Sequence, residues 1–260
     1  MRLQPRAAMA AIVLCAAAAL TACGSDEGAA AYVAIGDSYS SGVGAERYTE
    51  ESGACLRSTQ SYVHLLDREL SSFRACAGAT TGGVIDLQLK PFPDNAKLVT
   101  LTVGGNDAGF LAVIATCLLK GTAACEKRID QAERYARGEL TARLGRTYDA
   151  IRRRAPDATI VVAGYPRLVA RGPWCGSFGN VDDVEQRRIN ASSDLLAKIV
   201  AAEVRKHEGF RFVDVREEFE GHGACADDPW INASTNPGIY SFHPNVKGYA
   251  AYARVIKRSL

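Results

Sequence analysis

The 260-residue sequence has little histidine and few of the patterns that bind metals or nucleic acids. Only 4 residues are histidine, and the formal net charge is +2, with no long basic stretch. No Cys-x-x-Cys pair occurs, and no histidine stands at ligand spacing beside a cysteine. These absences speak against a nucleic-acid partner and against a zinc site. We expect the protein to need no metal and no cofactor.

Internal repeats are also missing, and low-complexity sequence is confined to the first 31 residues. The composition is ordinary for a globular protein, with 47% hydrophobic and 23% charged residues. A chain of this length suits one domain with a substantial core. We therefore expect residues 32–260 to form a single domain, and we expect a monomer.

The longest apolar run lies at the N-terminus and is too short to span a membrane. Residues 7–20 are almost wholly Ala, Leu, Val and Ile, and two arginines precede them. This pattern is typical of a signal peptide. The run ends in Leu-Thr-Ala-Cys, which resembles a bacterial lipobox. We expect residues 1–22 to be a lipoprotein signal peptide and Cys23 to receive the lipid; ordinary secretion with a chance cysteine is the alternative.

The signal predicts where the protein acts. Residues 23–31 are small and polar at their start, which is typical of a flexible tether. The protein is expected to be exported and then either held on the extracytoplasmic face of the cell membrane by its lipid or secreted.

Cysteine usage favours export as well. Cys15 leaves with the signal peptide and Cys23 is the lipidation candidate, so six of the 8 cysteines remain. An even number in an exported domain suggests disulfide bonds, although six cysteines allow many connectivities. Cys117 and Cys125 bracket a short segment that a disulfide would close naturally. The simplest complete set is Cys55–Cys76, Cys117–Cys125 and Cys175–Cys225.

Apolar runs and amphipathic patterns alternate along the domain. Runs typical of strands lie at 32–35, 98–103, 159–163 and 210–213, and a further short strand is expected around 73–76. Patterns typical of helices lie at 62–70, 129–154, 184–206 and 246–256. This alternation predicts an α/β fold with a parallel sheet covered on both faces. We interpret one apolar stripe at helical spacing as core packing: Leu195, Leu196, Ile199, Val200 and Val204.

Two long segments are rich in Gly, Pro and aromatic residues, at 167–181 and 224–239. Loops of this length without secondary structure are often functional in compact domains. A disulfide between Cys175 and Cys225 would join them. We expect them to form a substrate rim with the apolar residues Phe92, Phe110, Leu111, Trp174, Phe178, Trp230 and Ile231.

Three short polar motifs lie far apart in the chain. Gly36–Ser40 (GDSYS) and Gly104–Asp107 (GGND) each follow an apolar run, and Ser241–Asn245 (SFHPN) lies near the C-terminus. Ligands of open α/β sheets bind at the carboxyl ends of the strands, so the three motifs are expected to meet there. Together they offer a nucleophile, hydrogen-bond donors and a base, which is the equipment of an acyl-ester hydrolase.

Ser38 and His243 are the candidates for nucleophile and base. A serine hydroxyl attacks poorly unless a neighbouring base takes its proton. Ser38 follows directly from the end of a predicted strand, with Ser40 and Ser41 as alternatives. His243 stands just before a predicted helix, whereas each of the other three histidines is more simply a surface residue. A neutral imidazole can accept a proton near pH 7.

Acyl transfer also needs donors aimed at the oxyanion that forms. The side-chain amide of Asn106, just after a predicted strand, can supply one. The backbone N–H of Gly78, which no Cβ obstructs, can supply another. Each motif alone is weak, but their order along the chain is specific.

In these blocks the sequence resembles the SGNH hydrolase superfamily, also called GDSL esterases and lipases, and in particular its secreted actinobacterial lipase branch. The resemblance rests on Gly36–Gly42 (GDSYSSG), Gly78–Thr80 (GAT), Gly104–Asp107 and Ser241–Asn245. Gly164–Arg167 (GYPR) also resembles a segment of that branch. The resemblance extends from about residue 32 to the C-terminus.

The resemblance implies a fold and a set of roles. The fold would be the three-layer α/β/α, flavodoxin-like arrangement with a mostly parallel sheet. Ser38 would be the nucleophile and His243 the base, and the three disulfides named above match the usual pattern of the branch. The oxyanion would be bound by Gly78, Asn106 and the amide of Ser38.

One position departs from the common family pattern. Many members carry an aspartate three residues before the histidine, where this chain has Tyr240. Several members of the lipase branch use a main-chain carbonyl there instead. We expect the Tyr240 carbonyl to orient His243, with Asp227 or Asp228 as the alternative.

Three functions remain open from the sequence. The first is a serine esterase or lipase that acts on acyl esters. The second uses the same residues to deacetylate a polysaccharide. The third is a lipoprotein that binds lipid or glycan without catalysis, although such a protein would be expected to lack at least one of the four site residues.

Overall fold

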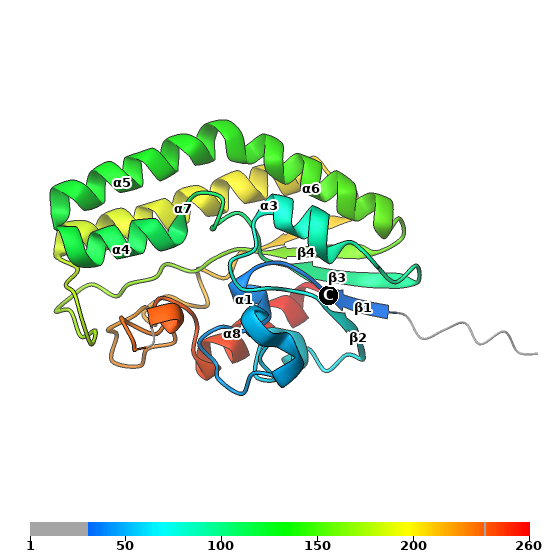
Figure 1. Cartoon of the computed structure of the whole chain (residues 1–260), viewed down its shortest axis with the longest axis horizontal. Helices are drawn as coiled ribbons and strands as arrows, with labels where there is room; N and C mark the ends of the chain where they lie inside the picture. Colours follow the sequence, from blue (N-terminus) through cyan, green and yellow to red (C-terminus); the bar gives the residue numbers. More distant parts are fainter. Residues whose placement is uncertain (1–30, 237) are drawn as a thin grey trace, which may run out of the picture.

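The computed structural model describes residues 31–236 and 238–260, and it places a five-stranded sheet between two layers of helices (Figure 1). The strands are β1 (Ala31–Ala34), β2 (Leu70–Phe73), β3 (Ala96–Leu101), β4 (Thr159–Ala163) and β5 (Phe210–Val213). They are hydrogen-bonded in the order β2-β1-β3-β4-β5, and all neighbours are parallel. The α/β/α architecture expected from the sequence is confirmed.

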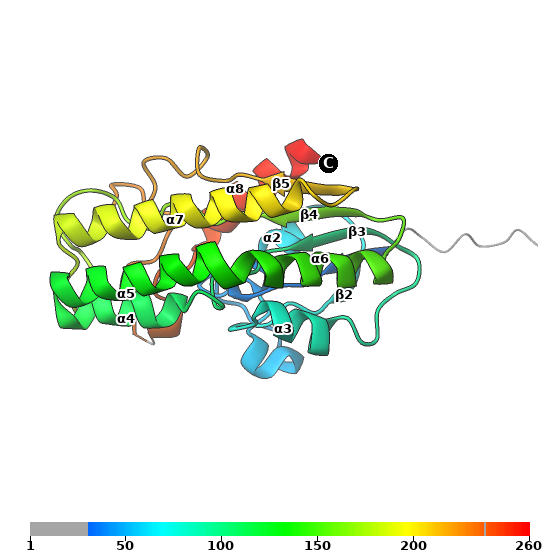
Figure 2. The ribbon, with the colours of Figure 1, turned by 90° about the horizontal axis from the view of Figure 1, so that it is seen from above.

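Helices of different lengths cover the two faces of the sheet. The long ones are α4 (Phe110–Lys120), α5 (Thr122–Tyr135), α6 (Thr141–Arg154), α7 (Asp183–Val204) and α8 (Val246–Ser259). The short ones are α1 (Ser38–Ser41), α2 (Tyr62–Leu65) and α3 (Thr81–Gly83), with the 3₁₀ turns η1 (Glu50–Cys55) and η4 (Gly238–Tyr240) and the π turns η2 (Val84–Gln88) and η3 (Ala136–Leu140). Helices α3, α5, α6 and α7 lie on one side of the sheet, and α1, α2 and α8 lie on the other (Figures 1 and 2). In the part of the chain described, no helix combines the length and the apolar character needed to cross a bilayer.

Side chains that alternate along each strand build two separate cores. Val33 and Ile160 pack into the core under α6, whereas Tyr32 and Val161 pack into the core under α8. Successive residues of a strand point to opposite faces. Because both faces are covered, the strands appear in the sequence as nearly continuous apolar runs.

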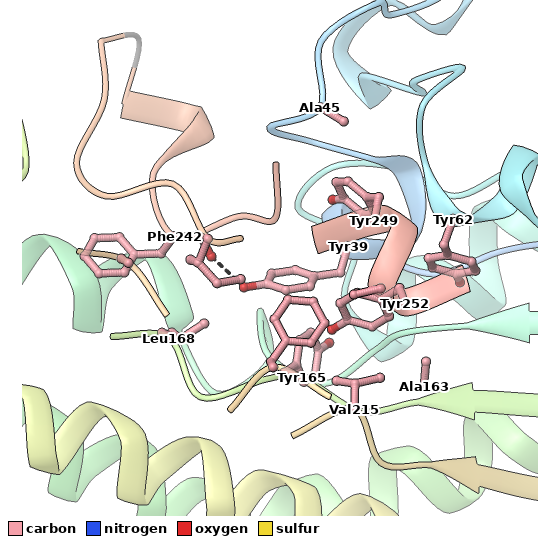
Figure 3. Packing of buried hydrophobic residues seen from close by; sticks show 14 of the residues in the cluster. Tyr39, Ala45, Tyr62, Ala163, Tyr165, Leu168, Val215, Phe242, Tyr249 and Tyr252 are labelled. Carbon is pink, nitrogen blue, oxygen red and sulfur yellow. Dashed lines mark hydrogen bonds between the residues drawn. The ribbon is translucent and has the colours of Figure 1, made fainter. Parts of the chain in front are cut away.

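The core on the α8 side is rich in buried tyrosine (Figure 3). Tyr62 stacks on Tyr252, with 5.9 Å between ring centroids. The Tyr252 hydroxyl donates to the Gly164 carbonyl and the Tyr249 hydroxyl donates to the Val43 carbonyl, each at 2.8 Å. These hydroxyls therefore fix the loops that follow β1 and β4.

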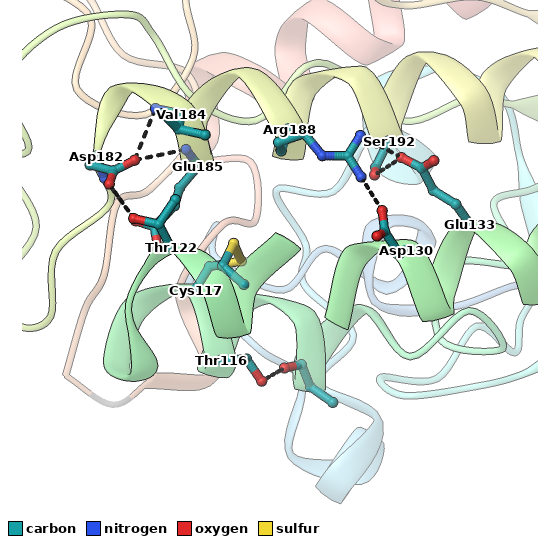
Figure 4. The surroundings of a disulfide bond; sticks show 12 residues. Thr116, Cys117, Thr122, Asp130, Glu133, Asp182, Val184, Glu185, Arg188 and Ser192 are labelled. Carbon is teal, nitrogen blue, oxygen red and sulfur yellow. Dashed lines mark hydrogen bonds and ion pairs between the residues drawn. A yellow bond between two sulfur atoms is a disulfide. The ribbon is translucent and has the colours of Figure 1, made fainter. Parts of the chain in front are cut away.

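Helices α4, α5 and α7 extend beyond the carboxyl ends of the strands (Figure 1). A disulfide between Cys117 and Cys125 joins α4 to α5 (Figure 4). At the start of α7, Asp182 caps the helix and also accepts a hydrogen bond from the Thr122 hydroxyl at 2.5 Å. The three helices are thus tied together at their ends farthest from the sheet.

The structure contains the three expected disulfides, with Cys55–Cys76 and Cys175–Cys225 completing the set. Three expectations about secondary structure were wrong in their bounds. The strand expected at 73–76 lies at 70–73, and the helix expected at 62–70 ends at Leu65. The helix expected at 129–154 begins at Thr122 and is divided into α5, η3 and α6. In addition, no expected helix covers α4. Ala31, assigned to the tether, belongs to β1.

Candidate active site

Ser38 begins α1 just beyond the carboxyl end of β1. The preceding turn requires glycine at Gly36, because φ is +113° and a Cβ there would lie 2.4 Å from the Thr102 carbonyl oxygen. The Gln88 side chain holds this turn from both sides, accepting from the Gly36 N–H at 2.7 Å and donating to its carbonyl at 2.9 Å. The chain is therefore forced to turn at the sheet edge and to present the Ser38 side chain there.

The alternative nucleophiles are held inside the protein. Ser40 is buried, and its hydroxyl lies 2.9 Å from the hydroxyls of Tyr62 and Thr102. Ser41 is also buried, and its hydroxyl donates to the Ser38 carbonyl. Neither hydroxyl approaches a histidine through a hydrogen bond in the described structure, so only Ser38 has a partner that could act as a base.

His243 lies against Ser38, although 205 residues separate them. Its Nε2 is 2.8 Å from the Ser38 Oγ, and its Nδ1 is 3.0 Å from the Ser241 carbonyl oxygen. A carbonyl oxygen only accepts, so Nδ1 carries the hydrogen and Nε2 offers its lone pair to the serine hydroxyl. Burial lowers the pKa of His243 from 6.5 to about 4, so the ring is neutral near pH 7.

The expectation that the Tyr240 carbonyl orients His243 was wrong, because the Ser241 carbonyl takes that place. The Tyr240 carbonyl instead accepts from the main-chain N–H of His243 at 3.2 Å, closing the turn before the histidine. The aspartates considered as alternatives lie elsewhere. Asp227 is exposed, and Asp228 binds Lys247. In the described part of the chain, no carboxylate hydrogen-bonds to the imidazole of His243.

Asn106 follows β3 and lines the same pocket as Ser38. Its side-chain amide donates to the Ala79 carbonyl at 3.0 Å, which uses one of its two hydrogens and leaves the other available. The next residue, Asp107, accepts from the Thr81 N–H at 2.9 Å and from the Thr81 hydroxyl at 2.6 Å. The loop after β3 is therefore fastened to the loop that carries the glycine block.

Gly78 is placed for a role as an amide donor. Its φ of +78° favours glycine, although a Cβ would meet no atom within 4 Å. The N–H groups of Ala77 and Ala79 on either side donate to the carbonyls of Cys55 and Cys76. Within the described chain the N–H of Gly78 itself has no acceptor, and the same holds for the N–H of Ser38.

Asp37 links the three loops of the site, a role that the sequence analysis missed. Its buried carboxylate, 1% exposed, accepts from the Thr102 hydroxyl at 2.5 Å, from the Tyr39 N–H at 3.0 Å and from the Tyr165 hydroxyl. The Tyr165 oxygen in turn accepts from the Gly105 N–H at 3.3 Å. Burial raises the pKa of Asp37 from 3.8 to about 6. The sequence pointed to this network only through the presence of an aspartate next to Ser38 and of a tyrosine in the GYPR segment.

An apolar pocket opens beside Ser38, between α4, α5 and α7. Leu195 and Leu196 line it, and Leu196 also packs against both cores, as the sequence predicted, whereas Leu195 belongs to neither core. The rest of that stripe is correctly assigned, because Val200 and Val204 lie in the core under α6 and Ile199 packs against it. The pocket walls are completed by Asp37, Tyr39, Gly105, Ala108, Phe110, Val113, Ile114, Ala132, Glu133, Ala136, Tyr165, Leu168, Ile189, Ser192 and Ser193.

The predicted rim is only partly present. Phe110 lines the pocket, and Leu111 and Phe178 are exposed, 66% and 39% respectively. Phe92 and Ile231 are instead buried in the two cores. The two tryptophans have other neighbours. Trp174 stacks on Phe242, and Trp230 stacks on His222 with ring centroids 3.6 Å apart.

A serine and a neutral histidine in contact at the carboxyl edge of a parallel sheet, beside an apolar pocket, are features of ester hydrolases. The chain belongs to the GDSL-like lipase/acylhydrolase family, which it matches over residues 34–251. It is a carboxylic ester hydrolase of that family, as the sequence motifs indicated.

Individual relatives support this assignment. The chain is 43% identical to a lipase of Streptomyces rimosus over 221 residues, which are 84% of this chain and 81% of that lipase. The crystal structure of the extracellular lipase of the same species is similar, with a TM-score of 0.83 and 41% identity, covering 89% of this chain and all of that one. The crystal structure of phospholipase A1 from Streptomyces albidoflavus NA297 also has a TM-score of 0.83, with 36% identity, covering 90% of this chain and 100% of that one.

Proposed function

We propose that the protein is an exported serine esterase that hydrolyses acyl esters through a Ser38–His243 dyad and an acyl-enzyme intermediate. The contact of 2.8 Å between Ser38 Oγ and His243 Nε2 carries this proposal. The hydrogen bond from Nδ1 to the Ser241 carbonyl supports it, because that bond selects the tautomer in which Nε2 is free to accept a proton.

In the acylation step, His243 Nε2 takes the proton of Ser38 while Oγ forms a bond to the ester carbonyl carbon. The carbonyl oxygen becomes an oxyanion. When the tetrahedral intermediate collapses, the bond to the alcohol oxygen breaks, and the proton on Nε2 passes to the leaving alkoxide. The acyl group is then bonded to Ser38, and the alcohol is released.

In the deacylation step, water replaces the alcohol. Nε2 accepts a proton from the water, whose oxygen bonds to the acyl carbon and forms a second oxyanion. Collapse breaks the bond to Ser38 Oγ, and the proton on Nε2 returns to the serine. The Ser241 carbonyl stabilises the transient imidazolium less than a carboxylate would, because it has no full charge.

The oxyanion would be bound by the N–H groups of Ser38 and Gly78 and by the amide of Asn106. The two backbone groups are unpaired within the described chain, and the Asn106 amide has one hydrogen to spare. Loss of one such donor typically lowers the rate about 100- to 1000-fold. Asn106→Ala is expected to fall in that range.

We propose a lipid ester rather than a polysaccharide acetate as the substrate. The similar Streptomyces proteins are named as a lipase and as a phospholipase A1, and the pocket beside Ser38 is mainly apolar. A deacetylase would use the same dyad, so substrate tests separate the two. Retention of all four site residues speaks against a protein that only binds lipid or glycan.

Export of this chain is supported by its similarity to the extracellular lipase of Streptomyces rimosus. The signal peptide at 1–22, the lipid on Cys23 and most of the tether at 23–31 lie outside the described residues. We propose that the lipid holds the enzyme on the membrane. Cys23→Ser is then expected to release active enzyme or to block its maturation, whereas an unchanged distribution between membrane and medium would exclude the anchor.

The function is tested with p-nitrophenyl esters from acetate to palmitate beside acetylated xylan. We expect ester hydrolysis that Ser38→Ala and His243→Ala abolish to a similar extent. The double variant should be no worse than either single one, because the pair acts as a unit. Activity on acetylated xylan that exceeds the activity on every p-nitrophenyl ester would favour the deacetylase instead.

A further inference from the structure

We infer that Tyr165 and Asp37 are positioning residues, which hold the side-chain amide of Asn106 at the place where the oxyanion forms. This inference rests on the proposed function and deepens it. It gives the tyrosine of the GYPR segment a role in the reaction, and it gives a reason for the carboxylate that is buried directly beside the nucleophile.

Asn106 stands in a loop that has little support of its own. The two residues before it are Gly104 and Gly105, which have no side chains to pack in place, and α4 begins only at Phe110. On one side, hydrogen bonds from the Asn106 amide and to the carboxylate next to it fasten the loop to the segment 79–81. A loop fastened on one side could still rotate about that contact, so the position of the amide depends on the other side as well.

Tyr165 supplies the contact on the other side. Its hydroxyl oxygen accepts from the Gly105 N–H at 3.3 Å, and a Cβ at position 105 would lie 3.4 Å from the ring carbon that carries the hydroxyl. The ring itself packs edge-on against Tyr39, with 5.1 Å between the centroids (Figure 3). Tyr165 therefore meets the main chain one residue before Asn106 through both its ring and its hydroxyl.

Asp37 determines the direction of these hydrogen bonds. Burial raises its pKa to about 6, so the carboxylate is ionised at pH 8 and can only accept. The single hydrogen of the Tyr165 hydroxyl is therefore donated to Asp37, and the Tyr165 oxygen is left to accept from Gly105. Burial also raises the pKa of Tyr165, so the hydroxyl keeps its hydrogen.

This chain of hydrogen bonds connects two residues that each stand next to a reacting group. Asp37 precedes Ser38, and Gly105 precedes Asn106. Asp37 lies beyond the end of β1 and Tyr165 beyond the end of β4, and β3 lies between these two strands in the sheet. The bond between Asp37 and Tyr165 thus spans the carboxyl end of β3 and fixes the nucleophile relative to the amide.

The position of the Asn106 amide matters most in the transition state. An oxyanion is bound strongly only by donors that already lie at hydrogen-bond distance from the place where it forms. The carbonyl oxygen of the bound ester carries much less charge, so it gains less from the same donor. Displacement of the amide should therefore lower kcat and leave KM nearly unchanged.

Tyr165→Phe tests the inference, because it keeps the ring and removes the hydroxyl. With p-nitrophenyl butyrate at pH 8, we expect kcat to fall about tenfold while KM stays within about twofold, since a displaced oxyanion donor costs less than the about 100-fold of a missing one. In the Asn106→Ala background the same change should lower kcat less than about twofold, because the amide that Tyr165 positions is already gone. An unchanged kcat in the wild-type background, or a loss of about tenfold in both backgrounds, would overturn the inference.

Two other tyrosines provide matched controls. The Tyr39 hydroxyl donates to the Phe242 carbonyl beside the histidine, so Tyr39→Phe should lower kcat by the same factor with and without Asn106→Ala. This shows that the weaker enzyme can still register a further loss. Tyr32→Phe removes a buried hydroxyl that lies between β1 and β3 and bonds only to Thr100, and it should leave kcat within about twofold in both backgrounds.

Asp37→Asn is a second variant that covers failure of Tyr165→Phe to fold. The asparagine oxygen can still accept from the Tyr39 N–H and the Thr102 hydroxyl, which both bind Oδ1, whereas the amide nitrogen faces Tyr165 and reverses that hydrogen bond. We again expect kcat to fall about tenfold alone and less than about twofold in Asn106→Ala. Equal losses in the two backgrounds would overturn the inference.

The same variants separate this inference from the proposed function. Ester hydrolysis that persists in Ser38→Ala would contradict the dyad, whatever Tyr165→Phe does. An Asn106→Ala enzyme with the kcat of wild type would remove the role of Asn106 in binding the oxyanion, and this inference with it, but would leave the dyad in place.

Discussion

The Tyr39 hydroxyl donates a hydrogen bond of 2.5 Å to the Phe242 carbonyl (Figure 3). The residue after the nucleophile thus holds the residue before the histidine. Phe242 is buried and has a φ of +58°, a conformation that a bulky residue adopts only when its surroundings enforce it. Trp174 stacks on its ring. Tyr39 therefore aligns the two halves of the dyad across 203 positions of sequence.

Tyr39→Phe tests this alignment, because it keeps the ring and removes the hydroxyl. We expect kcat to fall about tenfold with little change in KM, since the histidine loses a support while the ring of residue 39, which lines the pocket, is kept. The free energy of unfolding should fall by only about 1 kcal/mol, the usual worth of one hydrogen bond. Steady-state kinetics and urea unfolding measure the two effects.

The control for that variant is Tyr32→Phe. The Tyr32 hydroxyl lies 2.9 Å from the Thr100 hydroxyl in the same core and makes no contact with the dyad. Its loss should lower stability by a similar amount while kcat stays within about twofold. Equal losses of kcat in the two variants would show that Tyr39 acts only through general stability.

Replacement of the neighbouring aspartates should leave the enzyme active. The Ser241 carbonyl orients His243, and Asp228 is engaged with Lys247 and Trp230. Asp227→Asn and Asp228→Asn are therefore each expected to keep kcat/KM within about threefold of wild type. A loss as large as that of His243→Ala in either variant would mean that a carboxylate completes a triad.

The activity should persist into acid. A base must be neutral to accept a proton, and burial lowers the pKa of His243 to about 4, so the neutral form is lost only as the pH falls through that value. With an unperturbed pKa of about 6.5, only about 3% of the imidazole would be neutral at pH 5. The pH dependence of kcat/KM reports the ionisation of groups in the free enzyme. We expect protonation of His243 to cause almost no fall in kcat/KM between pH 8 and pH 5. Burial raises the pKa of Asp37 to about 6, so protonation of Asp37 can also affect the pH profile, and Asp37→Asn removes that contribution. A fall in kcat/KM with a pKa near 6.5 that survives in this variant would contradict the expectation for His243.

Loss of the disulfide between Cys175 and Cys225 should affect both stability and catalysis. It joins the two loops that flank the histidine, and the neighbouring Trp174 packs on Phe242. The double serine variant should lose about 2–4 kcal/mol of unfolding free energy. Its kcat should fall more than that of the corresponding Cys117 and Cys125 variant, whose disulfide joins α4 to α5.

The oxidation state itself is checked on the mature wild-type protein. A non-reduced proteolytic digest should contain the three linked peptide pairs when analysed by mass spectrometry. Free thiols at these six positions would remove the basis of the stability prediction.

Much of the sheet could be predicted because parallel strands covered on both faces are apolar throughout. The bounds of β4 and β5 agree with the runs at 159–163 and 210–213. Helix α4 was missed because its sequence, FLAVIATCLLK, has no polar face. Leu111 and Leu119 on that helix are exposed, so periodicity could not separate its buried side from its outer side.

The site was predictable to the extent that it lies in short local motifs. Ser38 and His243 could be chosen because each stands next to a break in an element. Which carbonyl faces the imidazole could not be chosen, because it depends on how the turn from Gly238 to His243 closes. The hydrogen bonds of Asp37 and the lining of the pocket bring together residues from separate elements. Patterns of residue spacing within one segment cannot predict such long-range contacts.

The most direct test of the dyad is to find which atom becomes covalently modified. Paraoxon should inactivate the enzyme with one diethylphosphoryl group per molecule, and peptide mass spectrometry should place that group on Ser38. His243→Ala should react far more slowly, and Ser38→Ala should take up none. A phosphoryl group on Ser40 or Ser41, or full labelling of Ser38→Ala, would contradict the assignment of Ser38 as the nucleophile.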